Sequence, residues 1–226
     1  MTNNTIHASD VNPQPRQTMS NRSGQRSPLA LTILALLVEE PMHAYRMHEL
    51  IKSRGKDTVV NVAQRNSVYQ TIDRLLRSGL IRVKMTLRDQ GRPERVVYEL
   101  TAEGSAALQE WLSAMLGEPA TEFPEFPAAL AFLMLLPPKE AALRLRARGE
   151  ALKRQLAKEQ AATKAARDSG LPRLFLIEDE YKQTMLRAEI AWVISLIRDL
   201  RTRKLSWNAK WLREMAAKFE GRSGPY

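Results

Sequence analysis

The sequence predicts a mainly α-helical protein of two domains, with a single β-hairpin among the helices of the first domain. Of its 226 residues 44% are hydrophobic, but only 6% are aromatic and only ten are glycine, which favours helices over a β-sandwich. Apolar residues recur at helical spacing along most of the chain, and they alternate only between residues 81 and 100. Three prolines within residues 117–127 then separate the two domains.

Residues 1–27 are predicted to form a disordered tail. They are dominated by Asn, Thr, Ser, Gln, Pro and Gly, with almost no periodic apolar pattern to bury. The tail carries Arg16, Arg22 and Arg26, so an arm that reaches a DNA minor groove is the alternative to a plain leader.

The first three helices are predicted from their boundary residues and apolar spacing. One helix starts at Pro28, with Ser27 as its N-cap, and ends before Pro41. A second short helix covers residues 43–52, and a third covers residues 64–78. The stripe of the third helix that is expected to be buried consists of Val68, Ile72, Leu75 and Leu76.

A β-hairpin is predicted after Gly79, which ends the third helix. The alternation of apolar and polar residues indicates a half-buried strand, whose apolar members are Ile81, Val83, Met85 and Leu87. Gly91 and Pro93 mark a turn, and residues 96–100 form the returning strand. Thr101 then caps a fourth helix, which completes a domain over residues 28–116.

The second domain, residues 128–226, is predicted to be entirely helical after a linker at 117–127. Two long helices are expected at 138–169 and 173–204. The second of these has two apolar stripes at heptad spacing. One stripe is Leu186, Ile190, Val193, Ile197 and Leu200, and the other is Tyr181, Met185, Ala188 and Trp192. A helix with two apolar faces suggests dimerisation, here through the first stripe, and a fully buried central helix is the alternative.

Composition and motifs exclude several classes of function. Without cysteine the chain has no disulfide and no Cys-ligated metal, and it has no phosphate-binding glycine loop and no hydrolase or metalloprotease motif. His43 and His48 are five residues apart, which puts them on different faces of a helix. The apolar run 29–38 is too short to span a membrane. We therefore expect a cytoplasmic protein that is not an enzyme and that uses no cofactor or metal.

The net charge of +10 favours an anionic partner. The basic residues that matter are concentrated between Arg54 and Arg95, where ten basic and four acidic side chains lie. The order helix, helix, helix, hairpin, helix is the layout of a winged helix-turn-helix, in which the third helix enters the DNA major groove.

Three groups of residues are then candidates for DNA contacts. The candidates for base edges are Arg65, Asn66 and Gln70, and those for phosphates are Ser67, Tyr69 and Arg74. The predicted hairpin, which is the wing of such a domain, adds Arg88, Arg92 and Arg95. The alternative for this helix face is an ordinary solvated surface.

Three strings of residues resemble the PadR family of bacterial transcriptional regulators. The family's recognition helix is similar to NSVYQTIDRLLRSGLI, residues 66–81, and its wing to GRPERVVYELTAEG, residues 91–104. Its opening helix pair is similar to LTILALLVEEPMHAYRMHEL, residues 31–50. The chain departs from the family at Ala44, where the family usually has Gly, and at Gln70 and Asp73.

The resemblance implies a homodimer that binds a pseudo-palindromic operator in double-stranded DNA and represses transcription. The long second domain resembles the branch of the family with extended C-terminal regions. Some relatives release DNA when an aromatic or hydrophobic compound binds near the dimer interface. Candidates for such an effector site here are Tyr181, Met185 and Trp192, with simple core packing as the alternative. The alternative function is a winged-helix module that binds proteins and no specific DNA sequence.

Overall fold

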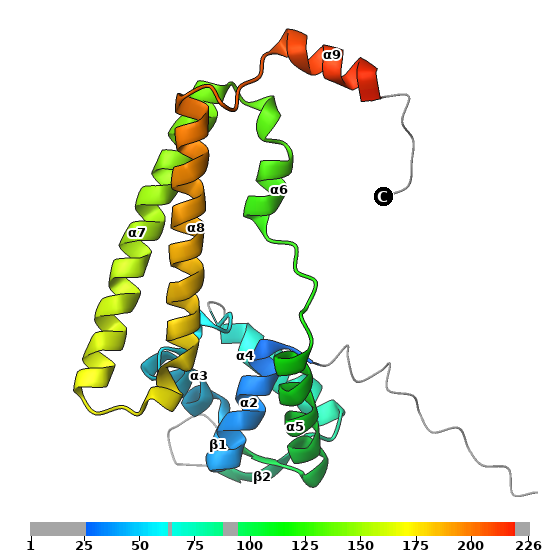
Figure 1. Ribbon diagram of the computed structural model, residues 1–226. Helices are drawn as coiled ribbons and strands as arrows, with labels where there is room; N and C mark the ends of the chain where they lie inside the picture. The colour runs from blue at the N-terminus through cyan, green and yellow to red at the C-terminus, as the bar shows by residue number, and fades with distance from the viewer. Residues whose placement is uncertain (1–25, 63–64, 88–94, 220–226) are drawn as a thin grey trace, which may run out of the picture. The chain divides into compact units, whose positions relative to one another are not determined.

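The computed structural model describes residues 26–62, 65–87 and 95–219, apart from the side chain of Arg65 (Figure 1). The chain divides into two compact units, residues 1–121 and 122–226. The predicted architecture, mainly helical with a small antiparallel sheet, is confirmed. The predicted tail lies outside the described residues, except for Arg26 and Ser27.

The helices of the N-terminal unit begin and end where local chemistry requires. The hydroxyl of Ser27 accepts a hydrogen bond from the N–H of Ala30 over 3.2 Å and caps the first helix. Thr101 caps the last helix in the same way through the N–H of Gly104, at 3.0 Å. Gly79 has a φ of +71°, the left-handed conformation that ends a helix. The elements in chain order are α2 (Pro28–Glu39), β1 (Met42–His43), α3 (Ala44–Ser53), the 3-10 helix η1 (Lys56–Thr58), α4 (Arg65–Arg77), β2 (Ile81–Leu87), β3 (Arg95–Leu100) and α5 (Ala102–Gly117).

The sheet has the strand order β1-β3-β2, and both pairs are antiparallel. Strand β1 is a two-residue addition that the sequence pattern does not reveal. Met42 pairs with Tyr98, and His43 pairs with Val97. This short strand ties the start of α3 to the returning strand of the hairpin, so His43 and Tyr98 belong to one surface.

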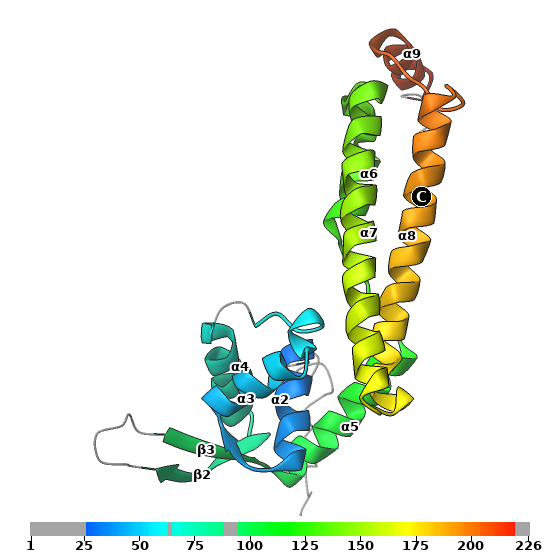
Figure 2. The same cartoon turned by 90° about the vertical axis from the view of Figure 1, so that its left-hand side faces the viewer.

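The core of the N-terminal unit lies among its helices and at the base of the hairpin. Ile33, Met47 and Ile72 are fully buried there. Strand β2 differs from the expectation of a half-buried strand, because Ile81 alone of its residues is buried. Val83, Met85 and Leu87 are 49%, 46% and 43% exposed. The hairpin projects beyond the helices, which cover only its base (Figure 2).

The C-terminal unit is built on two long helices that lie side by side (Figures 1 and 2). Gly170, with a φ of +86°, follows the first of them and lets the chain turn back. The elements in chain order are α6 (Glu125–Ala131), the 3-10 helix η2 (Leu133–Leu135), α7 (Pro138–Asp168), the 3-10 helix η3 (Arg173–Leu176), α8 (Ile177–Arg201) and α9 (Ala209–Phe219).

The contact between α7 and α8 also contains a buried polar pair. Gln183 donates a hydrogen bond from Nε2 to the hydroxyl of Thr163 over 2.8 Å, and both side chains are buried. Arg187 in turn donates to the amide oxygen of Gln183 at 3.2 Å. The pair is therefore satisfied, as a buried polar group requires.

The first apolar stripe of α8, predicted to form the dimer surface, packs partly inside its own unit. Val193 and Leu200 are buried against α7, together with Ala141 and Leu145. Ile197 packs partly on the same cluster, and Leu186 and Ile190 are half-buried. Helix α7 therefore supplies the apolar surface on which this side of α8 packs.

The second stripe of α8 stays on the surface. Tyr181, Met185 and Trp192 are 65%, 47% and 47% exposed. The alternative of a fully buried central helix is therefore wrong. If α8 has a partner from a second chain, the exposed stripe is the face available to it.

Candidate nucleic-acid interface

Helix α4 presents a row of polar side chains to solvent. Asn66, Tyr69 and Gln70 are exposed, and their spacing of three and four residues puts them on one face. The opposite face is held in the core by Val68 and Ile72. The amphipathic pattern of α4 thus fixes which side chains an approaching molecule meets.

Arg74, expected to contact phosphate, is directed away from this row. Its Nη2 donates a hydrogen bond to the hydroxyl of Ser27 over 3.1 Å, and its Nε is buried without a partner. Ser67, also expected at phosphate, is half-buried. Arg65 begins α4, but its side chain lies outside the described residues.

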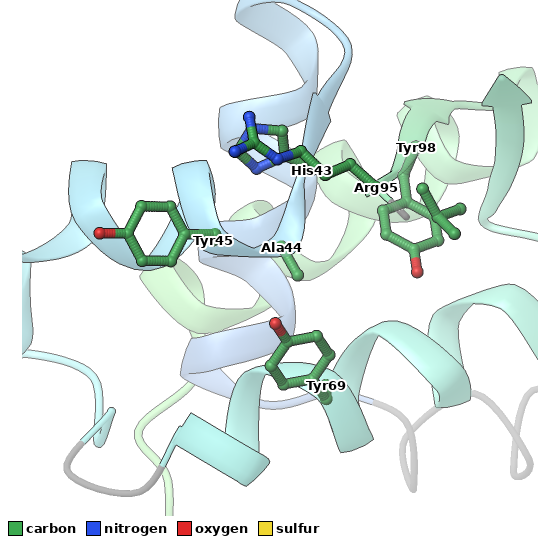
Figure 3. Close-up of a pocket in the computed structure, with 7 residues that line it drawn as sticks. His43, Ala44, Tyr45, Tyr69, Arg95 and Tyr98 are labelled. Atoms are coloured by element: carbon green, nitrogen blue, oxygen red, sulfur yellow. The ribbon is translucent and has the colours of Figure 1, made fainter. Parts of the chain in front are cut away.

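A groove of about 410 Å³ runs beside the exposed face of α4 (Figure 3). Three segments of the N-terminal unit meet there: the start of α3, the middle of α4 and the strand β3. Tyr69 reaches from α4 toward Ala44 at the start of α3. The lining residues are His43, Ala44, Tyr45, Tyr69, Arg95, Val96 and Tyr98.

His43 has a defined hydrogen-bonding role in this groove. Its Nδ1 accepts a hydrogen bond from the N–H of Arg46 over 3.0 Å and so caps α3. In the neutral imidazole the proton then resides on Nε2, which is a hydrogen-bond donor. The N-terminal end of α3, where the helix dipole favours an anion, lies at the same place.

Tyr98 adds a second hydrogen-bond donor to the groove. Burial raises the pKa of its phenol above the ordinary value of 10.0, and the nearby Asp73 and Tyr69 raise it further. The hydroxyl therefore stays protonated at neutral pH and can donate a hydrogen bond to an acceptor such as a phosphate oxygen.

The strands of the hairpin carry three described cations, two of which share one carboxylate. Arg82 donates from Nε to Glu99 over 2.7 Å, and Lys84 lies 3.5 Å from the same carboxylate. The hydrogen bond from Arg82 lowers the pKa of Glu99. Arg95 is exposed at the start of β3 and forms no ion pair with another described residue. Arg88 and Arg92 lie outside the described residues.

Two residues proposed for an effector site have different surroundings. Trp192 packs edge-to-face on Phe126, with ring centroids 6.1 Å apart. The guanidinium of Arg148 lies 3.6 Å above the same Phe126 ring and also pairs with Glu189. Tyr181 is largely exposed. The structure thus explains Trp192 partly as an anchor for α6 within its own unit.

The described residues contain neither a metal-binding cluster nor a membrane span. No group of three or more His, Asp or Glu side chains among them is arranged to hold a metal ion. Of the helices they form, none combines the length and the apolar character needed to cross a membrane.

Comparison with known proteins identifies the N-terminal unit. Residues 33–110 match the model of the transcriptional regulator PadR-like family. A comparison with curated proteins gives no match. The family match includes α3, α4 and β3, which supply residues that line the groove.

Several solved structures have a similar fold. The structure of Bacillus subtilis PadR in complex with operator DNA is 20% identical, with a TM-score of 0.63, and the match covers 77% of this chain and 99% of that one. The Vibrio cholerae virulence activator AphA is 20% identical, with a TM-score of 0.59 and coverage of 77% and 99%. Bacillus subtilis PadR in complex with p-coumaric acid is 18% identical, with a TM-score of 0.59 and coverage of 78% and 98%.

Proposed function

Residues 33–110 belong to the PadR-like family of transcriptional regulators, and we propose that this chain is a dimeric repressor that recognises a specific DNA sequence. The family consists of regulators rather than enzymes, in agreement with the lack of catalytic motifs in the sequence. A regulator of this kind acts on the chromosome, so a cytoplasmic location is part of the proposal.

The observation that carries the proposal is the polar face of α4 beside an arginine-bearing groove. Asn66 and Gln70 have amide groups that can pair with both the N6 and N7 positions of adenine in a major groove. Tyr69 and Arg95 lie at the groove, where a hydroxyl and a guanidinium suit phosphate oxygens. A similar protein, Bacillus subtilis PadR, has been solved with operator DNA, which supports the same partner here.

The remaining proposed DNA contacts come from residues that do not line the groove. Arg65 is proposed to read a base edge, and Arg88 and Arg92 are proposed to contact the backbone from the wing. Ser67 remains a candidate phosphate contact at the side of α4. Arg74 is removed from the set, because its guanidinium is committed to Ser27.

Dimerisation is proposed through the exposed stripe of α8. Tyr181, Met185, Ala188 and Trp192 recur at heptad spacing and are exposed. A two-fold dimer presents two copies of α4, so a pseudo-palindromic operator follows from its symmetry. An aromatic effector near Tyr181, Met185 and Trp192 has weaker support, because Trp192 already has Phe126 as a partner.

One observation favours the second candidate, a module that binds protein. Val83, Met85 and Leu87 form an exposed apolar row on β2. Such a row is suited to a protein surface as well as to insertion beside DNA bases.

The test is selection of genomic DNA fragments by the full-length protein at moderate salt. The repressor proposal expects an enriched pseudo-palindrome, and a reporter placed behind it should be less active when the protein is present. Recovery of fragments with no shared sequence would favour the protein-binding module. A rise in reporter activity would replace repression by activation.

A further inference from the structure

A second groove, of about 940 Å³, lies in the C-terminal unit and is lined by residues where α7 begins and α8 ends. These two helix ends lie at the top of Figure 1. Its lining combines four cationic side chains with an apolar floor and includes no acidic residue. The cations are Lys139, Arg146, Arg201 and Arg203. The apolar members are Pro137, Pro138, Ala142, Leu143, Leu200 and Trp207, and Ser206 and Asn208 complete the lining.

The four cations have no acidic partner among the described residues, unlike their neighbours on α7. Arg144 pairs with Glu140, and Arg148 pairs with Glu189. No ion pair within the described residues involves a cation that lines the groove. The groove therefore collects positive charge that the protein itself does not neutralise.

Helix dipoles do not account for this charge. Arg201 and Arg203 lie at the C-terminal end of α8, where cations are favourable. Lys139, however, is in the first turn of α7, where the dipole disfavours a cation. A bound anion would offset both the side-chain charges and the positive end of α7.

Arg203 is also held in an unusual backbone conformation. Its φ is +59°, and it is the one described non-glycine residue with a positive φ. The equivalent turns after α4 and α7 use Gly79 and Gly170. At the end of α8 the N–H of Leu205 bonds to the carbonyl of Asp199 over 3.1 Å and fixes the turn. An arginine where glycine is unstrained points to a use for its side chain.

The floor of the groove is rigid and apolar. The indole N–H of Trp207 donates to the carbonyl oxygen of Leu136 over 2.9 Å, so the ring has a fixed orientation. Leu200 is buried in the core beneath, while Leu143 remains exposed beside the cations. Apolar surface next to unpaired cations matches a molecule with an apolar body and an anionic head.

We propose that this groove binds an amphiphilic organic anion, whose carboxylate or phosphate head pairs with Arg146 and Arg203 while its apolar body lies on Leu143 and Trp207. The site is separate from the face of α4 and from the exposed stripe of α8. It gives the C-terminal unit a ligand of its own, independent of DNA binding.

The test is calorimetric titration of the full-length protein with four probes below their micellar concentrations. Decanoate and decyl phosphate carry the two head groups, decyl maltoside has an uncharged head, and inorganic phosphate lacks the apolar body. The proposal expects saturable binding of one or both anionic amphiphiles at one site per chain. Binding of only one would identify the head group. Equal binding of decyl maltoside, or equally tight binding of inorganic phosphate, would overturn it.

Two variants locate the site. Arg146→Gln combined with Arg203→Gly should weaken binding of the anionic probe at least about tenfold, because two charge-assisted contacts are lost. The glycine also suits the left-handed turn, so the fold is preserved. Arg213→Gln, an exposed cation outside the groove, is the matched control and should bind as the parent does. Unchanged affinity of the double variant for the anionic probe would overturn the proposal. A change in the variant's oligomeric state, measured by light scattering, would also overturn it and would assign the groove to a second copy of the chain.

Discussion

Arg74 on α4 and Ser27 before α2, 47 residues apart, are joined by a 3.1 Å hydrogen bond from the guanidinium to the hydroxyl. The same hydroxyl accepts the N–H of Ala30 and caps α2. Arg74 of α4 therefore bonds to the residue that caps the start of α2. We therefore expect Arg74 to stabilise the domain rather than to contact DNA.

Arg74→Met should lower the free energy of unfolding by about 1 kcal/mol, because the hydrogen bond to Ser27 is lost while the buried Nε is removed. Urea unfolding measures this change. At temperatures where the variant is folded, fluorescence anisotropy should show the parent's dependence of DNA affinity on salt. A salt slope reduced by about one would instead mean that Arg74 contacts a phosphate.

Asn66→Ala and Arg95→Ala should affect DNA binding differently. Loss of the Asn66 amide should cost about 1–3 kcal/mol on the selected site and relax the preference for one base pair. Loss of Arg95 should weaken binding to all DNA sequences alike and reduce the slope of log affinity against log salt by about one. Anisotropy with the selected site and a scrambled site separates the two effects, and Lys158→Ala, an exposed α7 cation, is the control. The assignment fails if both variants lose affinity equally on both sites.

Tyr181→Glu combined with Met185→Glu should convert the protein to a monomer at micromolar concentration. Both residues are exposed on the second stripe of α8, and burying two carboxylates in an apolar interface is costly. Light scattering measures the mass. Ala151→Glu, on the exposed face of α7, is the control and should leave the mass unchanged. A dimer that survives the double substitution uses another surface.

Two helical glycines, Gly104 and Gly149, should respond to alanine in opposite directions. A Cβ at Gly149 would lie 3.7 Å from Val193, an ordinary contact, so the better helix propensity should stabilise the protein by about 0.5–1 kcal/mol. A Cβ at Gly104 would overlap the backbone oxygen of Leu80, and the strain should cost about 1–3 kcal/mol or more. Urea unfolding of both variants gives the two signs, and equal signs would contradict the packing described for α5 and α7.

Glu39 and Arg54 should make a small contribution to stability that depends on pH. The two pair through both carboxylate oxygens, with Nη2 2.7 Å from Oε2, and the hydrogen bond lowers the pKa of Glu39 below its ordinary value of 4.5. The contribution is therefore complete above that value and is lost as the pH falls through the pKa of the folded state. Because both side chains are more than one third exposed, Glu39→Gln should cost only about 0.5 kcal/mol at pH 7.

The measurement is urea unfolding of Glu39→Gln and the parent at pH 7 and at about pH 3. The difference between the two proteins should shrink at the lower pH, as the parent's carboxyl takes up its proton. Glu103→Gln, at an exposed residue of α5, is the control. A difference that persists in acid would show that Glu39 acts through packing instead.

Much of the fold follows from local sequence, and the site follows only in part. The starts of α2 and α5 and the end of α4 were predictable because Ser27, Thr101 and Gly79 act on residues beside them. Strand β1 was not predictable, because its two residues are a strand only through pairing with β3. The family resemblance stated from residues 31–50, 66–81 and 91–104 is confirmed by the family match.

The residues whose surroundings differ from the sequence-based expectation do so for one physical reason. A helical pattern gives the side of the helix on which a residue lies but not what covers that side. The pattern therefore placed Arg74 among the exposed residues, although its side chain bonds to Ser27, and it could not show that α7 covers part of the first stripe of α8. His43 and Tyr98 were missed for a related reason, since their shared groove depends on the pairing of β1 with β3.

The hydrogen bond between Gln183 and Thr163 determines how the α7–α8 pair can move. Sliding α8 along α7 by one turn, about 5.4 Å, would separate the buried amide nitrogen of Gln183 from its acceptor, at a cost of about 1–3 kcal/mol, although the Thr163 hydroxyl would still donate to the carbonyl of Glu159. The pair therefore resists ratcheting. The bond thereby favours one register between the two helices along α8, whose 25 residues span about 37 Å.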